Sequence, residues 1–204
     1  MLDIQVPRTT YGFASNTYVI SSCGECAVID PTVPYDPEKF LLKVKYIFLT
    51  HVHFDHMLEI DSWTNAEGAE VVVSYKEKDA LSDSYRNCYK IFASQDRGYY
   101  GKASVMREGD VFTVGDTKLT VMECPGHTVG SVTLITDGVA FVGDTVFAGG
   151  GYGRWDLPSG DYAALKASIR RIADLPEDTL LYPGHGEPCT AGQFKIDYSK
   201  KRII

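Results

Sequence analysis

The sequence predicts an α+β fold in which two β-sheets are packed between helices. Three observations support this. The 204 residues are 44% hydrophobic and 23% charged, a balance typical of globular proteins. Short β-rich runs recur along the chain and are joined by tight turns. A few helix-like segments carry apolar residues on one face. Sheets and amphipathic helices bury their apolar faces against each other, so two sheets between helices is the expected layering.

The N-terminal part of the chain alternates β-rich runs with short helical segments. Gly24 lies in the turn of an expected hairpin, and Asp36 followed by Pro37 is typical of a helix start. A second helix is expected over 55–66, with Met57, Ile60 and Trp63 on one face. We expect strands at 16–21, 26–30, 46–50 and 71–74.

The C-terminal part continues the β pattern and adds one long amphipathic helix. We expect strands at 111–114, 118–124, 131–136, 139–142 and 179–182, and a helix at 161–173. Turns at 115–116 and 137–138 contain Gly next to Asp, which favours hairpins. Because hairpins join most of these strands, we expect both sheets to be largely antiparallel.

Residues 75–109 differ from the rest because they are polar and rich in tyrosine. We expect an insertion here, within a single domain that spans residues 1–204, and we expect it to lie over a site. Tyr85 and Tyr89 are the candidates to line a substrate pocket, since tyrosine offers an apolar ring and a polar tip. Packing of the insertion onto the core, or a dimer contact, explains these tyrosines equally well.

Charge and cysteine content limit the class of protein. The chain has 20 Lys and Arg against 27 Asp and Glu, a net charge of −7, which disfavours binding to nucleic acid. No apolar run is long enough to span a membrane, and no leader-like segment opens the sequence. Five cysteines, an odd number, favour reduced thiols in the cytoplasm over a disulfide framework.

The segment His51-Val52-His53-Phe54-Asp55-His56 directly follows an expected buried strand. In an extended segment alternate side chains point the same way, so His51, His53 and Asp55 are expected to converge, with His56 beside them. Imidazole and carboxylate groups are typical ligands of divalent metals. Four such groups in six residues exceed what one tetrahedral ion with an open position needs, which indicates two metals.

Three further candidate ligands follow later strands in glycine-containing turns. These are His127 in Pro-Gly-His-Thr, Asp144 in Gly-Asp-Thr and His185 in Pro-Gly-His-Gly. Such turns allow the backbone to approach a site and direct a side chain into it. All five histidines of the chain therefore fall into one pattern, which favours a metal centre over unrelated turn residues.

The motif at 51–56, followed in order by the three later ligands, resembles the metallo-β-lactamase superfamily. The resemblance implies a four-layer αββα sandwich with its site at one edge of both sheets. It also implies two divalent metal ions, most simply zinc, with iron or manganese as alternatives. Asp55 and Asp144 would take part in catalysis. The implied ligands are His51, His53 and His127 for one metal, Asp55, His56 and His185 for the other, and Asp144 as a bridge.

Residues 125–131, 143–147 and 153–161 are similar to the short glyoxalase II-like, or hydroxyacylglutathione hydrolase-like, branch. The resemblance implies a small-molecule substrate, a thioester such as an S-acylglutathione, hydrolysed through a metal-bridging hydroxide. Arg154 is a candidate to bind a substrate carboxylate, and a structural ion pair with Asp156 is the alternative.

Other functions stay open at this point. They are a mononuclear iron persulfide dioxygenase of a related branch, a lactone or ester hydrolase, and a non-catalytic metal-binding protein. A mononuclear site would have less need of Asp55, His56 and His185. Their presence favours the dinuclear hydrolase.

Overall fold

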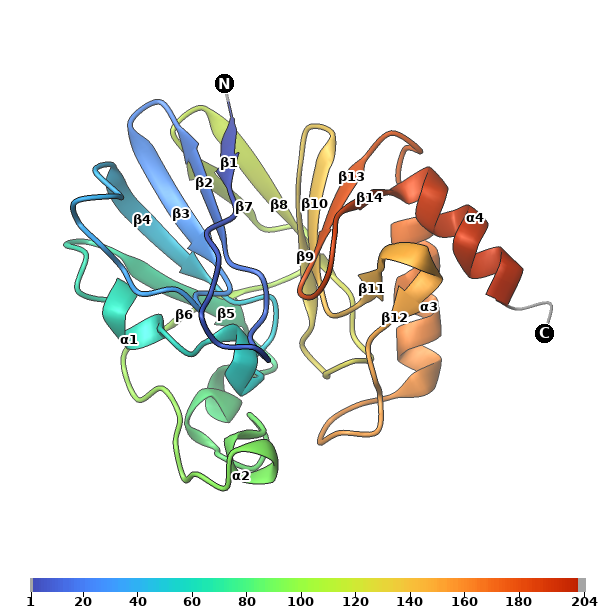
Figure 1. The fold of residues 1–204 in the computed structure, drawn as a ribbon, viewed down its shortest axis with the longest axis horizontal. Helices are drawn as coiled ribbons and strands as arrows, with labels where there is room; N and C mark the ends of the chain where they lie inside the picture. Colours follow the sequence, from blue (N-terminus) through green and yellow to red (C-terminus); the bar gives the residue numbers. More distant parts are fainter. Residues whose placement is uncertain (1, 202–204) are drawn as a thin grey trace.

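A computed structural model describes residues 2–201 of the chain. It contains two six-stranded sheets that face each other, with helices on the outer sides (Figure 1). The first sheet has the order β1 (Asp3–Gln5), β2 (Tyr18–Ser22), β3 (Glu25–Ile29), β4 (Lys43–Phe48), β5 (Glu70–Ser74), β6 (Ser104–Met106). The second has the order β14 (Cys189–Thr190), β13 (Leu180–Pro183), β10 (Val139–Gly143), β9 (Val132–Thr136), β8 (Thr117–Glu123), β7 (Val111–Val114).

Short helices and one small ribbon complete the structure. The α-helices are α1 (Ile60–Trp63), α2 (Tyr89–Phe92), α3 (Tyr162–Ala173) and α4 (Ala191–Lys201). Three 3₁₀ helices are η1 (Phe54–His56), η2 (Lys78–Ser82) and η3 (Ala148–Gly150), and a two-stranded ribbon pairs β11 (Val146–Phe147) with β12 (Gly151–Tyr152). No helix within residues 2–201 has both the length and the apolar composition needed to cross a membrane.

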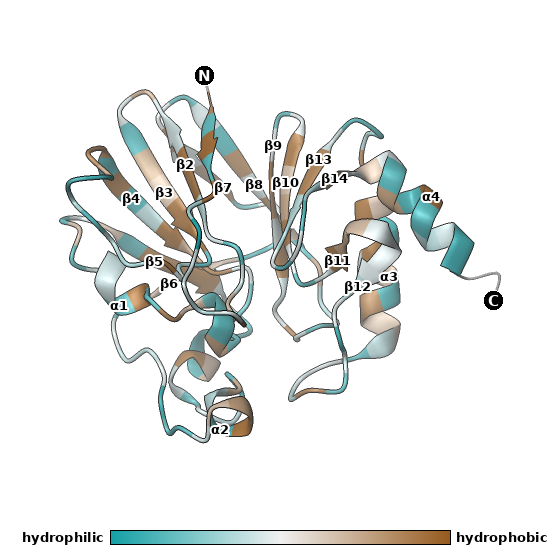
Figure 2. Ribbon diagram, in the orientation of Figure 1, coloured by the Kyte–Doolittle hydropathy of each residue, from teal (hydrophilic) through white to brown (hydrophobic). Residues whose placement is uncertain are grey.

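Three apolar clusters fill the spaces between neighbouring layers, because successive side chains of a strand point to opposite faces of its sheet. On β2, Ile20 packs between the two sheets while Val19 packs on the outer side of the first sheet. On β10, Phe141 likewise faces the first sheet while Ala140 and Val142 face α3 and α4. Figure 2 shows the hydrophobic residues concentrated on the strands, with α4 largely hydrophilic. The order helix, sheet, sheet, helix is the predicted αββα sandwich.

The expectation of largely antiparallel sheets is wrong for the first sheet. Only β1–β2 and β2–β3 are antiparallel there, whereas β3–β4, β4–β5 and β5–β6 are parallel. Parallel neighbours require crossover connections of a dozen or more residues, and the segments after β3, β4 and β5 have that length. In the second sheet the parallel pair is β10–β13, so these two strands end at the same edge.

The predicted long helix is confirmed, and two other helix predictions are wrong in part or in full. Asp161 caps α3 by accepting a hydrogen bond from the backbone N–H of Ala164 at 2.8 Å. Asp36 instead accepts from the N–H of Glu38 and closes a turn without a helix. The helix expected over 55–66 is divided into η1 and α1, because the backbone of Met57 leaves helical geometry.

Residues 75–109 contain η2, α2 and the edge strand β6. The sequence did not predict β6, a three-residue strand that pairs with β5 through Val72–Ser74. Asn87 holds the segment together, since its side-chain amide donates to the carbonyls of Leu81 and Arg97. The assignment of 75–109 as an insertion stays a prediction.

Candidate metal centre

The predicted ligands meet where the strands of both sheets end at one edge of the sandwich. The segment after β4 carries the first four, and the loops after β8, β10 and β13 carry the other three. Close backbone packing draws these loops together. A Cβ atom on Gly184 would overlap Asp144 and the ring of His56, so a side chain at this position would displace the site.

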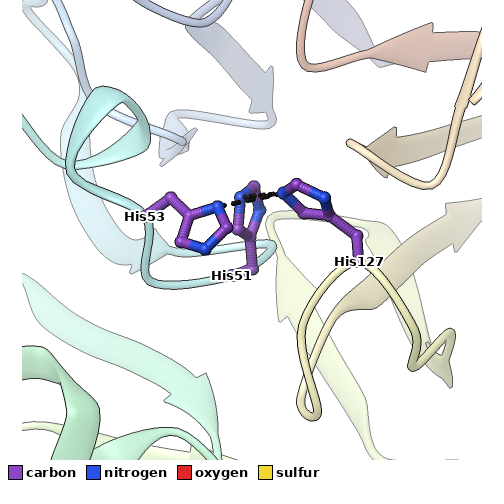
Figure 3. Close-up of side chains that lie close together, drawn as sticks. All are labelled: His51, His53 and His127. Carbon is purple, nitrogen blue, oxygen red and sulfur yellow. Dashed lines mark hydrogen bonds between the residues drawn. The ribbon is translucent and has the colours of Figure 1, made fainter. Parts of the chain in front are cut away.

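Three imidazoles from opposite loops converge on one point (Figure 3). Nε2 of His127 lies 3.2 Å from Nε2 of His51 and 3.0 Å from Nδ1 of His53. All three rings are buried, with 1–3% of their surface exposed. The group therefore has the composition of a three-nitrogen metal site.

Hydrogen bonds on the far side of these rings fix which nitrogens face the centre. Nδ1 of His127 lies 2.6 Å from the backbone carbonyl of Arg154 and must donate to it. Nδ1 of His51 lies 3.2 Å from Oγ1 of Thr50, a hydroxyl that itself donates to Asp30. Both Nε2 atoms are thus left as unprotonated acceptors facing each other, an arrangement that fits a bound cation.

The pKa values of the three rings agree with that assignment. Burial lowers the pKa of His51 far below its ordinary value, and neighbouring imidazoles lower it further. Burial also lowers the pKa of His53 to about 3 and lowers that of His127. All three rings are therefore neutral at pH 7, which is the form that binds a metal.

A second group gathers beside the first. Nε2 of His185 lies 3.3 Å from Oδ2 of Asp55, and ligand atoms of these two residues and His56 all lie within 4.8 Å of one another. Although burial opposes the positive charge, Asp30 and Asp144 raise the pKa of His56 well above its usual value. A cation beside His56 would take the place of that proton.

Asp144 lies between the two groups. Its Oδ1 is 3.3 Å from Nε2 of His56, while its Oδ2 is 3.5 Å from Nε2 of His185 and 3.7 Å from Nε2 of His127. Burial opposes ionisation of this carboxyl, but the surrounding imidazoles hold its pKa well below its ordinary value. It is therefore an anion placed to contact ions on both sides.

Unpartnered buried atoms provide the test of whether a metal fits. Nε2 of His56 and Oδ1 of Asp144 are buried and face each other at 3.3 Å without the geometry of a hydrogen bond. An unpaired buried polar group costs about 1–3 kcal/mol, so such atoms are rare without a ligand. The donor set, nitrogens and carboxylate oxygens, suits zinc, iron or manganese. The residues fit two divalent ions.

Asp30 is a functional residue that the sequence analysis missed. This buried carboxylate accepts from the N–H of Thr50 at 2.8 Å, from its hydroxyl at 2.7 Å and from Nδ1 of His56 at 2.8 Å. Its backbone has φ +52°, a strained conformation outside glycine. Asp30 thus orients one candidate ligand directly and His51 through Thr50.

Glu77 was missed as well. Its carboxyl group accepts from the N–H of Val52, between two candidate ligands, and bonds to Thr128, next to a third. Burial raises the pKa of Glu77 to about 7. This side chain joins the two loops that carry the three-histidine group. Neither residue belongs to a recognisable motif, so only the three-dimensional structure identifies them.

Of the three predicted substrate-binding residues, one lines the cavity beside the centre and two do not. Arg154 lines the cavity beside the centre, but its guanidinium donates from Nε and Nη2 to the two carboxylate oxygens of Asp156, at 2.8 and 2.9 Å. Tyr89 is buried against Phe54 and does not line this cavity. Tyr85 is 60% exposed and does not line it either.

The fold and this centre define a class, the αββα proteins with a His and Asp metal site at one sheet edge. The family model described as "Metallo-beta-lactamase superfamily" matches residues 10–185. The chain belongs to that superfamily.

Relatives and solved structures agree with this membership. The chain is 32% identical to a "Beta-lactamase hydrolase-like protein" of Xylella fastidiosa, over 89% of this chain and 47% of the relative, so it spans about half of that protein. It is 32% identical to "Hydroxyacylglutathione hydrolase GloC" of Haemophilus influenzae, over 78% of this chain and 76% of the relative. The structure of BLEG-1 B3 metallo-beta-lactamase superposes with a TM-score of 0.82 at 30% identity, over 95% of both chains. TTHA1623 in a di-iron-bound form superposes with a TM-score of 0.76 at 28% identity, over 92% of this chain and 95% of the other.

Proposed function

We propose that the chain is a dinuclear metal-dependent hydrolase that cleaves thioesters, of which S-acylglutathiones are one type. The observation that carries the proposal is the position of Asp144 between two groups of candidate ligands. A largely buried carboxylate whose oxygens lie near side chains of both groups is an arrangement that fits a two-metal site. The hydroxyacylglutathione hydrolase of Haemophilus influenzae, at 32% identity, supports the thioester as substrate.

In this proposal seven side chains hold the two ions. One ion would be held by three histidines, the other by two histidines and an aspartate, and Asp144 would contact both. The ligands are His51, His53 and His127, then Asp55, His56 and His185. Two divalent cations, when bound, polarise a carbonyl oxygen and allow water to ionise near pH 7. Zinc is the proposed metal, because the nitrogen-rich donor set suits it.

The chain's own residues would orient the reactants and carry protons. Asp55 has one oxygen 3.3 Å from Nε2 of His185 and borders the cavity. Burial opposes ionisation, but the bond to His185 and the charge of His56 lower the pKa of Asp55. It is therefore a carboxylate at pH 7 and can accept a hydrogen bond from the attacking water.

The cysteines within residues 2–201 are all free, which supports the proposal that the protein works in a reducing cytoplasm.

The test is thiol release from thioesters by zinc-loaded protein, compared with the same sample after chelation. We expect release from S-lactoylglutathione or from simpler thioesters, loss with the chelator and recovery with zinc. An Asp144→Asn variant should lose most of the activity, whereas Asp61→Asn, at an exposed position of α1, should retain it. Absence of thiol release from every thioester by metal-loaded protein would contradict the proposal. Turnover of lactones or esters would then identify the alternative hydrolase.

A further inference from the structure

The cavity beside the metal centre has one polar wall and one apolar wall. Its volume is about 860 Å³, within the range of roughly 300–1,000 Å³ found for drug-sized ligands. The polar wall consists of five candidate metal ligands together with Arg154 and Gln95. The apolar wall comes from five separate places in the chain and consists of Phe13, Phe54, Phe92, Ala93, Phe147 and Leu157.

The aromatic rings of this wall form a connected surface. The ring centroids of Phe13 and Phe54 lie 5.6 Å apart, and those of Phe54 and Phe92 lie 6.0 Å apart with nearly parallel planes. Phe147 lies at the other end, 6.2 Å from the ring of His185. Apolar rings therefore lie both beside a candidate ligand and in a connected group of three elsewhere on the wall.

Two of these rings are exposed although their neighbours are buried. Phe13 is 57% exposed and Phe92 is 52% exposed, whereas Phe54 between them is 8% exposed. Exposed phenylalanines that line a cavity at a reactive centre offer apolar area to a ligand. Burying that area is favourable by about 25 cal/mol per Å².

The charges of the cavity disfavour a strongly anionic ligand. Among the described residues that line it, Arg154 is the basic side chain apart from the histidines. Its guanidinium is bound to both carboxylate oxygens of Asp156 and lies 5.8 Å from the ring of Phe92. No free lysine or arginine is thus available in this cavity for a ligand carboxylate remote from the metals.

We infer that the apolar wall binds the acyl group of the substrate, and that this group is a chain or ring of several carbons rather than a small hydroxyacyl group. The inference rests on the proposed function and specifies its substrate. A carbonyl placed at the metal centre has Phe54, Phe92 and Phe13 among the apolar residues that line the same cavity. An acyl group of several carbons fills more of a cavity of about 860 Å³ and contacts more of these rings than a small hydroxyacyl group does.

The test compares straight-chain acyl thioesters of one neutral thiol, N-acetylcysteamine, with zinc-loaded protein. We expect kcat/KM to rise by about twofold to fourfold per methylene from acetyl to octanoyl, fourfold being the limit for full burial. Phe92→Ala should flatten this dependence. Ile91→Ala, a neighbour on α2 that does not line the cavity, is the matched control and should preserve it.

Calorimetric binding of octanoate and acetate to the same protein gives a readout independent of turnover. Tighter binding of octanoate, reduced in Phe92→Ala, supports the apolar subsite even if no thioester is cleaved, in which case the proposed function alone fails. Hydrolysis with equal kcat/KM along the series, or equal binding of the two acids, overturns the subsite and leaves the hydrolase standing. An equal chain-length dependence in Phe92→Ala and wild type also overturns it.

Discussion

Replacement of Asp30 by asparagine should selectively weaken metal binding at the site that contains His56. Asp30 accepts three hydrogen bonds, two from Thr50 and one from Nδ1 of His56. Asparagine has one acceptor oxygen. If that oxygen faces the N–H of Thr50, the new amide N–H opposes the Nδ1–H of His56. The ring then relieves the clash by moving its proton to Nε2, the nitrogen that faces Asp144.

The opposite orientation of the asparagine is also unfavourable. Its amide N–H would then face the backbone N–H of Thr50, leaving a buried donor unpaired at a cost of about 1–3 kcal/mol. The first orientation removes the acceptor of His56, whereas the second keeps it and destabilises the backbone at Thr50, beside the ligand segment. We therefore expect about 10- to 100-fold weaker affinity, or about 1.4–2.7 kcal/mol, at the site of His56.

The assay is calorimetric titration of metal-free Asp30→Asn protein with zinc. The three-histidine site should lose much less affinity, because Asp30 reaches His51 only through Thr50. Circular dichroism would verify the fold, and Asp61→Asn, on the exposed face of α1, would serve as control. Two unchanged affinities in Asp30→Asn would refute the reasoning about the tautomer of His56.

Three further predictions follow from the geometry. Burial raises the pKa of Glu77 to about 7, so between pH 4.5 and 7 the folded state keeps a proton that the unfolded state releases, and stability falls as pH rises. Urea unfolding should show that the unfolding free energy falls less from pH 5 to pH 8 in Glu77→Gln than in the wild type, by up to about 3 kcal/mol. Equal falls in the two proteins would contradict this. Gly126→Ala should lower the unfolding free energy by more than about 2 kcal/mol, because φ is +135° and a Cβ would strike the backbone of α3. Its control is Gly138→Ala, where a Cβ meets open space at φ +72° and the expected loss is about 1 kcal/mol. Equal losses in thermal unfolding would argue against it. Asp156→Ala should release Arg154 and lower the KM for anionic thioesters about threefold relative to neutral ones, and an unchanged ratio would count against the ion-pair argument.

Alternation and capping signals made much of the fold predictable. The helix over Tyr162–Ala173 and most strands of the second sheet were identified because their apolar periodicity and turn residues are local. The parallel pairing of the first sheet was missed, since pairing depends on crossovers that leave no local signal. Short edge elements such as β1 and β6 were missed too, because three residues carry too little pattern.

The candidate ligands were predictable, and their surroundings were not. Histidines and aspartates in a dense motif indicate metal chemistry from sequence alone. Asp30 and Glu77 support the ligands from separate strands and turns, and their roles depend on three-dimensional contact. Tyr85 and Tyr89 were candidates to line the cavity, whereas the structure lines it with Phe13, Phe54, Phe92 and Phe147. A phenylalanine that lines a cavity and a phenylalanine that packs in a core look the same in the sequence, so the sequence did not identify these cavity residues.

The number of divalent ions per chain tests the central claim most directly. It would be measured by mass spectrometry on untagged protein, together with thiol release from thioesters by the same sample. The account predicts about two ions per chain and turnover that follows metal content, because six candidate ligands form two groups around Asp144, the seventh. A single iron per chain with oxygen consumption on a persulfide would contradict the dinuclear hydrolase. Protein that binds no metal tightly would contradict the metal centre itself.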